Sequence, residues 1–192
     1  MNSKKGLLVI LSAPSGCGKD TVFKELYKMR TDCVESISAT TREPRQGEVD
    51  GVNYFFKTNE DFENMIKSNQ LLEYANYNNC YYGTPIEGVQ NAINNGKICF
   101  LIIEVQGAKN VMKMMPEAVS IFLLPPSIES LKHRLSKRGT ESQLMIDNRI
   151  ALAQNEIDNA SFYKYKVVND ELEKAVEEIN NILNNELEAQ NN

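Results

Sequence analysis

The chain has 192 residues, of which 42% are apolar, so it can form one well-packed domain and is neither a disordered tail nor a fibre. Its 21 Lys and Arg residues against 26 Asp and Glu residues give a net charge of −5 at pH 7, and we expect no general affinity for nucleic acid or for an anionic membrane. The longest apolar run, Ile98–Ile103, is far shorter than the roughly 20 residues that cross a bilayer, and the first residues show no signal-peptide pattern. We therefore expect a soluble, cytoplasmic protein.

A strand, a glycine-containing loop and a helix are predicted at the start of the chain. The apolar run Leu7–Leu11 ends at a loop with Pro and Gly, which is typical of a central parallel strand buried on both faces. After Gly18, the residues Val22, Leu26 and Met29 recur at helical spacing. This spacing predicts a helix that begins where the loop ends.

The second half of the chain continues this alternation. Strands are predicted at residues 98–103, 119–124 and 166–168, and helices at about residues 108–115, 127–137 and 172–187. Thr140 and Gln143 have the spacing of a capping box and predict one more helix, with Ile146, Ile150 and Ala153 on one side. The alternation predicts an α/β fold in which helices flank a parallel sheet.

The stretch from about residue 38 to residue 87 has a different pattern. Two short strand-like pieces, Tyr54–Phe56 and Leu72–Tyr77, lie on either side of one helix that starts near Thr58, with Asp61 three residues later as a capping partner. No linker rich in Pro, Gly or Ser separates this stretch from the rest of the chain. We therefore expect an inserted subdomain rather than a separate domain.

The segment Ala13–Thr21 (APSGCGKDT) lies between the first strand and the first helix, where a phosphate-binding loop has to lie. Small residues let backbone N–H groups surround phosphate oxygens, the helix start adds partial positive charge, and Lys19 supplies a charge for the β- and γ-phosphates. The alternative is a tight strand-to-helix turn with a solvated lysine. Ala13 stands in place of the usual first glycine of this loop, and Asp20 in place of the hydroxyl residue that contacts magnesium.

Asp20 and Cys17 add two further expectations for this loop. A carboxylate is a good ligand for a hard cation, so Asp20 is a candidate Mg²⁺ ligand, directly or through water, although it also places negative charge near a triphosphate. Cys17 stands at the start of a helix, which predicts a lowered thiol pKa. The other cysteines, Cys33, Cys80 and Cys99, form no CxxC pair, and with a single histidine in the chain we predict neither a zinc site nor a disulfide.

Two arginines stand three residues apart, Arg42 and Arg45, beside a proline. On a stiff loop both can bind one phosphate through bidentate, charge-assisted hydrogen bonds. Their spacing equally allows surface arginines that pair with Glu43 or Glu48. Glu73, a lone carboxylate between apolar residues, is ambiguous by itself.

Six separated segments, taken together, resemble the guanylate kinase family in order and spacing: APSGCGKDT, SISATTREPRQGEVDGVNYFF, LLEYANYNNCYYGTP, EVQGA, RLSKRGTE and VVND. The match covers essentially the whole chain, so it is far more specific than a phosphate-binding loop alone. The resemblance implies a P-loop NTPase-type α/β core with an inserted nucleoside monophosphate-binding subdomain and a helical lid. It also implies transfer of the γ-phosphoryl group of MgATP to GMP, and to dGMP, in purine nucleotide metabolism.

The resemblance divides the chain into three parts. Residues 1–36, 88–127 and 159–192 would form the core with the ATP-binding loop, residues 37–87 the GMP-binding subdomain, and residues 128–158 the lid. Mg²⁺ would accompany ATP as the cofactor. ATP and GMP would be the small-molecule substrates, without nucleic acid or membrane partners, and the protein would be a monomer or a homodimer.

The resemblance also assigns site residues. The ATP-binding residues would be Ala13, Pro14, Ser15, Gly16, Cys17, Gly18, Lys19, Asp20, Thr21 and Asn169. The GMP-binding residues would be Ser38, Arg42, Arg45, Tyr54, Glu73, Tyr82, Thr84 and Glu104. The catalytic residues would be Lys19, Arg42, Arg45, Arg134, Arg138 and Arg149.

The chemistry of these residues suits the implied reaction. Guanine presents N1–H and an exocyclic amine as adjacent donors that one carboxylate can accept together, and adenine lacks this pair, so we expect Glu73 to select the base. The attacking phosphate oxygen of GMP is already anionic, so no general base is needed. Catalysis then depends on positioning two polyanions and neutralising charge on the transferred group, which is the work of Lys19 and the arginines.

Some positions depart from the family pattern or stay open. The family commonly has two acids two residues apart where Ile102 and Glu104 stand, which together with Asp20 predicts an altered magnesium shell. Asn169 and Asp170 fit a segment near the ATP base or a simple turn at the end of a strand equally well.

Two other functions compete with this one. One is a catalytically silent, guanylate-kinase-like binding module, against which the intact Gly16, Gly18, Lys19 and the arginines argue. The other is a kinase for a different nucleoside monophosphate, against which Glu73 with Thr84 argues.

Overall fold

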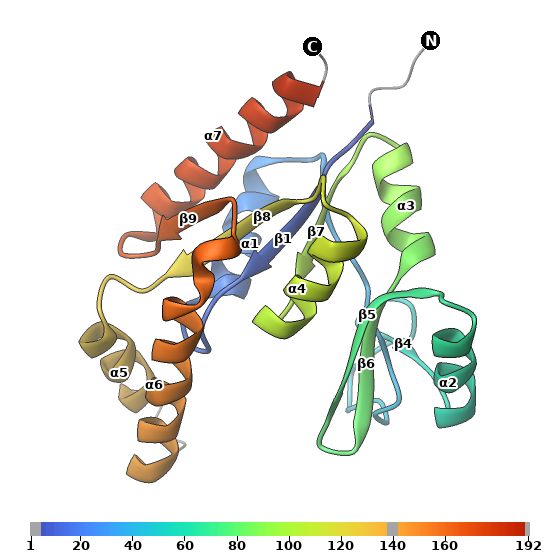
Figure 1. The fold of residues 1–192 in the computed structure, drawn as a ribbon, viewed down its shortest axis with the longest axis horizontal. Coiled ribbons are helices and arrows are strands. Elements are labelled where there is room, and N and C mark those ends of the chain that lie inside the picture. The colour runs from blue at the N-terminus through green and yellow to red at the C-terminus, as the bar shows by residue number, and fades with distance from the viewer. Residues whose placement is uncertain (1–4, 138–141, 191–192) are drawn as a thin grey trace.

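The computed structural model describes residues 5–137 and 142–190. A five-stranded parallel sheet forms the centre of the molecule, in the order β2-β7-β1-β8-β9 (Figure 1). Its strands are β1 (Leu8–Ser12), β2 (Cys33–Glu35), β7 (Ile98–Ile102), β8 (Val119–Leu124) and β9 (Tyr165–Val168). Strand β1 lies in the middle and is buried along its whole length, as its continuous apolar run predicted.

Helices cover both faces of this sheet, because successive side chains of a strand point to opposite sides. On one face lie α1 (Lys19–Met29) and α7 (Leu172–Gln190), which pack against Val9 and Leu11. On the other face lie α3 (Ile86–Asn94) and α4 (Val105–Met114), which pack against Leu8 and Ile10. The predicted α/β class with a helix-flanked parallel sheet is therefore confirmed.

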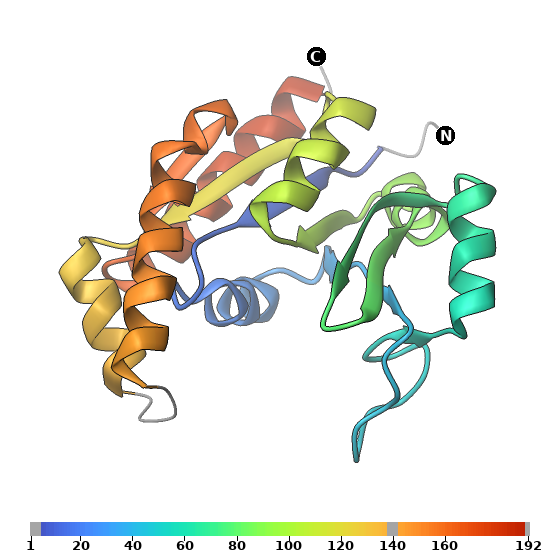
Figure 2. The same cartoon turned by 60° about the horizontal axis from the view of Figure 1, so that its bottom comes forward.

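A smaller sheet stands beside the central one, in the order β4-β3-β6-β5 (Figures 1 and 2). Its strands are β3 (Ala39–Thr40), β4 (Phe55–Phe56), β5 (Leu71–Tyr77) and β6 (Cys80–Pro85), and α2 (Asn59–Lys67) packs on it. The ring of Phe62 from α2 is fully buried and stacks on Tyr81, with 5.2 Å between ring centroids. Thr58 caps α2 by accepting the backbone N–H of Asp61 at 3.0 Å, as predicted.

Two helices, α5 (Ile128–Lys137) and α6 (Gln143–Asp158), lie together at the end of the central sheet that is remote from the smaller sheet (Figure 2). The predicted capping box is displaced, because the residue that caps α6 is Ser142, whose hydroxyl accepts the N–H of Met145. Thr140, the predicted cap, lies outside the described residues. A short 3₁₀ helix at Ala160–Phe162 connects α6 to β9.

Other element boundaries differ only locally from the sequence-based expectations. Helix α4 begins at Val105 rather than near residue 108, and α7 continues to Gln190. Strands β2, β3 and β6 and helix α3 were not expected from the sequence. Among the helices of the described residues, none is both long enough and apolar enough to cross a membrane.

Candidate active site

The loop between β1 and α1 has the backbone conformation that its glycines permit. Gly16 and Gly18 have φ values of 92° and 87°, in the left-handed region that side chains disfavour, and Gly18 is the residue before the first turn of α1. The non-glycine residues with positive φ in the described chain are all asparagines elsewhere. Ala13 is therefore unstrained, and its replacement of the usual glycine leaves the loop conformation intact.

Lys19 is held at the carboxyl ends of two neighbouring strands, β1 and β7. Its Nζ donates to the carbonyl oxygen of Ala13 at 3.1 Å and lies 3.2 Å from Oε1 of Glu104. The lysine side chain is only 13% exposed, whereas that of Glu104 is 70% exposed. Ligands of open α/β sheets bind outside the carboxyl ends of the strands. Lys19 therefore lies where its ammonium group could contact a bound phosphate.

Asn169 supports the loop from the end of β9. Its Nδ2 donates to the carbonyl oxygen of Cys17 at 2.7 Å, and its own carbonyl oxygen accepts from Nη2 of Arg134 at 3.0 Å. The backbone N–H of Asn169 also continues the pairing with β8 through Leu124. Asn169 therefore fixes the loop backbone from the end of a strand, while Asp170 is exposed.

The helices α5 and α6 bring two of the three expected lid arginines to this loop. Arg134 contacts Asn169, and Nη2 of Arg149 donates to the hydroxyl of Ser15 within the loop itself. Arg138 lies outside the described residues. The guanidinium group of Arg149 on α6 thus contacts the loop directly. That of Arg134 on α5 contacts Asn169, which in turn is bonded to the loop.

Glu73 and Thr84 meet on the smaller sheet. The Thr84 hydroxyl donates to Oε1 of Glu73 at 2.7 Å, and Thr84 is 1% exposed. Burial raises the pKa of Glu73, and the bond from Thr84 opposes this shift only in part. The structure therefore brings together the carboxylate and hydroxyl expected to read a base.

A second cluster holds Arg42 among aromatic rings. Its guanidinium lies 5.4 Å from the ring centroid of Tyr54, and the rings of Tyr54 and Tyr82 are 6.1 Å apart. Nη2 of Arg42 also lies 2.9 Å from Oε1 of Glu48, whose Oε2 accepts the backbone N–H of Arg45 at 2.7 Å. These bonds lower the pKa of Glu48.

The pairing of Arg42 with Glu48 is the alternative that the sequence left open. The carboxylate of Glu48 is the anion that pairs with Arg42 in the structure. The sequence signal for this ion pair was the position of Glu48, six residues after Arg42 in a loop that contains glycine. Ser38 lies at the start of the same sheet, where its carbonyl oxygen accepts the N–H of Phe55 at 2.9 Å.

A cleft of about 840 Å³ separates α1 from the loop at Val52 and Asn53, and Asp20, Glu35 and Ile102 also line it. Burial and repulsion from Asp20 raise the pKa of Glu35. The cleft thus extends from the first turn of α1, which follows the phosphate-binding loop, toward the smaller sheet.

The donor set suits a hydrated magnesium ion. Asp20 in the first turn of α1 and Glu104 before α4 both offer hard carboxylate oxygens, whereas Ile102 packs against the apolar core. Within the described ranges, no three His, Cys, Asp or Glu residues group closely enough to hold a metal alone. Because Mg²⁺ in nucleotide sites keeps several waters and uses one or two carboxylates plus the phosphates, this donor set fits it.

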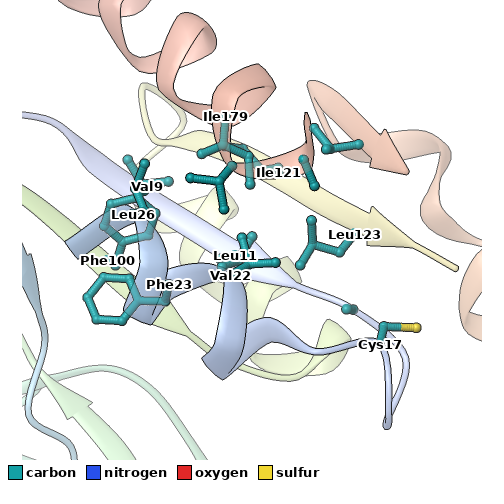
Figure 3. Close-up of a cluster of buried hydrophobic side chains, with 14 of the residues drawn as sticks. Val9, Leu11, Cys17, Val22, Phe23, Leu26, Phe100, Ile121, Leu123 and Ile179 are labelled. Atoms are coloured by element: carbon teal, nitrogen blue, oxygen red, sulfur yellow. The ribbon is translucent and has the colours of Figure 1, made fainter. Parts of the chain in front are cut away.

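Cys17 is not the low-pKa thiol that its position predicted. Its side chain is 0% exposed and packs at the edge of the buried cluster formed by β1, α1 and their neighbours (Figure 3). Burial raises its pKa to about 11, which outweighs the lowering by Arg134 and Lys19. The expectation was wrong because the thiol is buried, and the cost of desolvating a thiolate exceeds the lowering of the pKa expected at a helix start.

We therefore expect Cys17 to resist alkylation in the folded protein. At pH 8, iodoacetamide should modify the partly exposed Cys80 first, while Cys17, Cys33 and Cys99 are all buried and protonated. Peptide mass mapping over time checks this order, with urea-unfolded protein as the control in which all four react. Labelling of Cys17 as fast as Cys80, blocked by ATP, would contradict the structure.

Comparison with known proteins points to one family. The family model described as guanylate kinase matches residues 5–186. The guanylate kinase of Oceanobacillus iheyensis is 53% identical over 186 residues, which cover 97% of this chain and 90% of that protein. That of Bacillus anthracis is 53% identical over 184 residues, which cover 95% of this chain and 90% of the relative. The crystal structure of guanylate kinase from Anaplasma phagocytophilum has a TM-score of 0.74 at 34% identity, covering 97% of this chain and 89% of that one.

Proposed function

Because the chain belongs to the guanylate kinase family and transfers the γ-phosphoryl group of ATP to GMP, we propose that Glu73 selects the guanine and Lys19 holds the transferred phosphate. The observation that carries the first assignment is the half-buried carboxylate of Glu73, held by the buried Thr84 hydroxyl. The second is supported by the position of Lys19 at the carboxyl ends of β1 and β7.

The three parts of the chain follow from these assignments. We propose residues 37–87, which include the smaller sheet, as the GMP-binding subdomain, and residues 128–158, which include α5 and α6, as the lid. The remaining residues form the ATP-binding core. The contact of Arg149 with Ser15 supports a lid that acts directly on the phosphate-binding loop.

Guanine recognition follows from what the Glu73 carboxylate can accept. One bond from Thr84 leaves lone pairs on both oxygens for N1–H and the exocyclic amine of guanine. The Ser38 hydroxyl then supplies a donor for O6. Adenine has no donor at N1, so it would leave a desolvated carboxylate with an unsatisfied charge, which costs roughly 1–3 kcal/mol or more.

The GMP phosphate would exchange with Glu48. Arg42 lies beside Tyr54 and is paired with Glu48, and Arg45 is tied to the same carboxylate through its backbone. A dianionic phosphate is the stronger acceptor for two guanidinium groups, so we propose that it displaces the carboxylate and gains bonds from Arg42, Arg45, Tyr54 and Tyr82. Before GMP binds, the bond to Glu48 would keep Arg42 beside Tyr54.

Phosphoryl transfer then requires positioning and charge, not proton removal. The attacking GMP oxygen is anionic, and Lys19 with Arg134, Arg138 and Arg149 would neutralise the charge that spreads over the transferred group. Approach of the lid toward the smaller sheet would exclude water from the cleft and so limit ATP hydrolysis.

Magnesium would join this site with ATP, neutralising phosphate charge. Asp20 and Glu104 would hold it, largely through waters. Asp20 follows Lys19 in the sequence, and Glu104 forms an ion pair with Lys19. Glu104 would have to exchange Lys19 for the hydrated ion as ATP enters. The proposal includes a cytoplasmic location and a monomer or homodimer as the active unit.

The test is ADP release from ATP with different acceptors. With Mg²⁺ present, GMP and dGMP should be phosphorylated far faster than IMP, AMP, UMP or dTMP, and EDTA should abolish release. A coupled assay measures the rates, with no acceptor as the control for ATP hydrolysis. Equal rates with AMP would contradict the role of Glu73, and full activity in EDTA would contradict the role of the metal.

A further inference from the structure

Gly107, the third residue of α4, lies against the carboxylate of Glu73. A Cβ atom built on Gly107 would lie 2.9 Å from Oε2 of Glu73, 3.3 Å from its Cδ and 3.6 Å from its Cγ. The first of these distances is shorter than real Cβ contacts. The base-reading carboxylate therefore occupies space that is open only because residue 107 has no side chain.

A bulge in β5 aims Glu73 at this helix. The pairing of β5 with β6 shifts by one residue between Leu71 and Tyr74, so that two residues, Leu72 and Glu73, lie opposite Thr84 alone. In a regular strand these two neighbours would point to opposite faces. Here Leu72 packs with the apolar residues of α4 while Glu73 lies on Gly107 of the same helix.

A glycine at this helical position has no conformational reason of its own. Gly107 does not have positive φ, so any residue could adopt its backbone conformation. Within a helix, glycine is less favourable than alanine by about 1 kcal/mol. The close approach of Glu73 is the feature of the structure that accounts for glycine here.

We propose that Gly107 is a specificity-determining residue, because its missing side chain fixes the depth at which the Glu73 carboxylate meets guanine. This inference rests on the proposed role of Glu73. A methyl group at residue 107 would push Oε2 outward by at least about 0.5 Å, from 2.9 Å to the ordinary contact distance of 3.4 Å. The carboxylate is the mobile end of a side chain, so it can shift without disturbing the fold. The same shift would move both of its oxygens out of line with the two guanine donors.

The experiment compares Gly107→Ala with Gly88→Ala. Gly88 is also the third residue of a helix, α3, and a Cβ there meets nothing within 4 Å, so the control makes the same chemical change without the contact. For Gly107→Ala we expect the KM for GMP to rise about 10- to 100-fold and the preference for GMP over IMP and AMP to fall. The KM for ATP should stay within twofold and the melting temperature should not fall. Gly88→Ala should leave both KM values unchanged.

A second background separates this inference from the proposed function. In a Glu73→Ala protein the contact is gone, so adding Gly107→Ala should change the GMP dissociation constant, measured by calorimetry, by less than twofold. A full effect of Gly107→Ala in that background would overturn the inference, as would a KM for GMP unchanged by Gly107→Ala alone. If Glu73→Gln itself leaves GMP preference intact, the proposed function fails instead.

Discussion

Glu73→Gln should lower kcat/KM for GMP by about 10²- to 10³-fold and remove most of the preference for GMP over AMP. Glutamine keeps the size of the side chain but offers one carbonyl oxygen and an amide that donates. The glutamine carbonyl can accept from one of the two adjacent guanine donors. The other guanine donor loses its hydrogen bond and faces the NH2 group of the glutamine. The rest of the site, including Lys19 and Arg42, is untouched by this change.

The measurement is the coupled assay with GMP and AMP as acceptors. Glu63→Gln provides the matched control, since Glu63 is an exposed carboxylate on α2 of the same subdomain. It should leave both rates unchanged. A Glu73→Gln enzyme that still prefers GMP by its original margin would show that another group reads the base.

The same substitution should not destabilise the unliganded protein. Burial raises the pKa of Glu73 in the folded state above its usual value of 4.5, so the folded protein favours the protonated carboxyl. That favourable contribution is fully present below pH 4.5 and is lost as the pH rises through the raised pKa. At pH 7 the ionised carboxylate therefore costs stability that glutamine does not cost, and the melting temperature should be equal or higher at pH 7, with no such gain at pH 4.

The core of the fold is predictable from the sequence because its strands are continuous apolar runs. β1 and β8 are buried on both faces, and each is followed by a helical pattern. Strand β6 escaped prediction because its sequence, CYYGTP, contains glycine and proline. It pairs with β5, which precedes it directly, and with β3, some 40 residues away along the chain.

The site was predictable in its residue types but not in its contacts. The resemblance assigned Glu73 and Thr84 to the same site, and the two side chains are hydrogen-bonded, yet the bulge that turns Glu73 toward α4 depends on how β5 pairs with β6. The burial of the Cys17 thiol likewise depends on tertiary packing rather than on its position before a helix. Gly107 belongs to the segment EVQGA, which resembles the family, but its role follows only from the approach of the Glu73 side chain, which is distant in sequence.

The largest loss of rate is expected for Lys19→Met, with kcat reduced by about 10³-fold and GMP binding unchanged. Lys19 is the cation that the fold holds at the ends of β1 and β7, so it is oriented before the charge on the transferred group develops. Methionine keeps the length and the apolar stem of the side chain but removes the charge. The loss should therefore appear in kcat and in ATP affinity.

Folding should tolerate this substitution, which makes the kinetic result interpretable. The partner of Lys19, Glu104, is 70% exposed, so its carboxylate stays hydrated when the lysine is lost, and the ion pair contributes little stability. Lys28→Met on the same helix, which removes a surface pair with Glu25, is the matched control and should leave kcat unchanged. Single-turnover kinetics and calorimetric GMP binding check both variants. A Lys19→Met enzyme within tenfold of the normal kcat would mean that the arginines of α5 and α6, rather than the loop lysine, neutralise the transferred group.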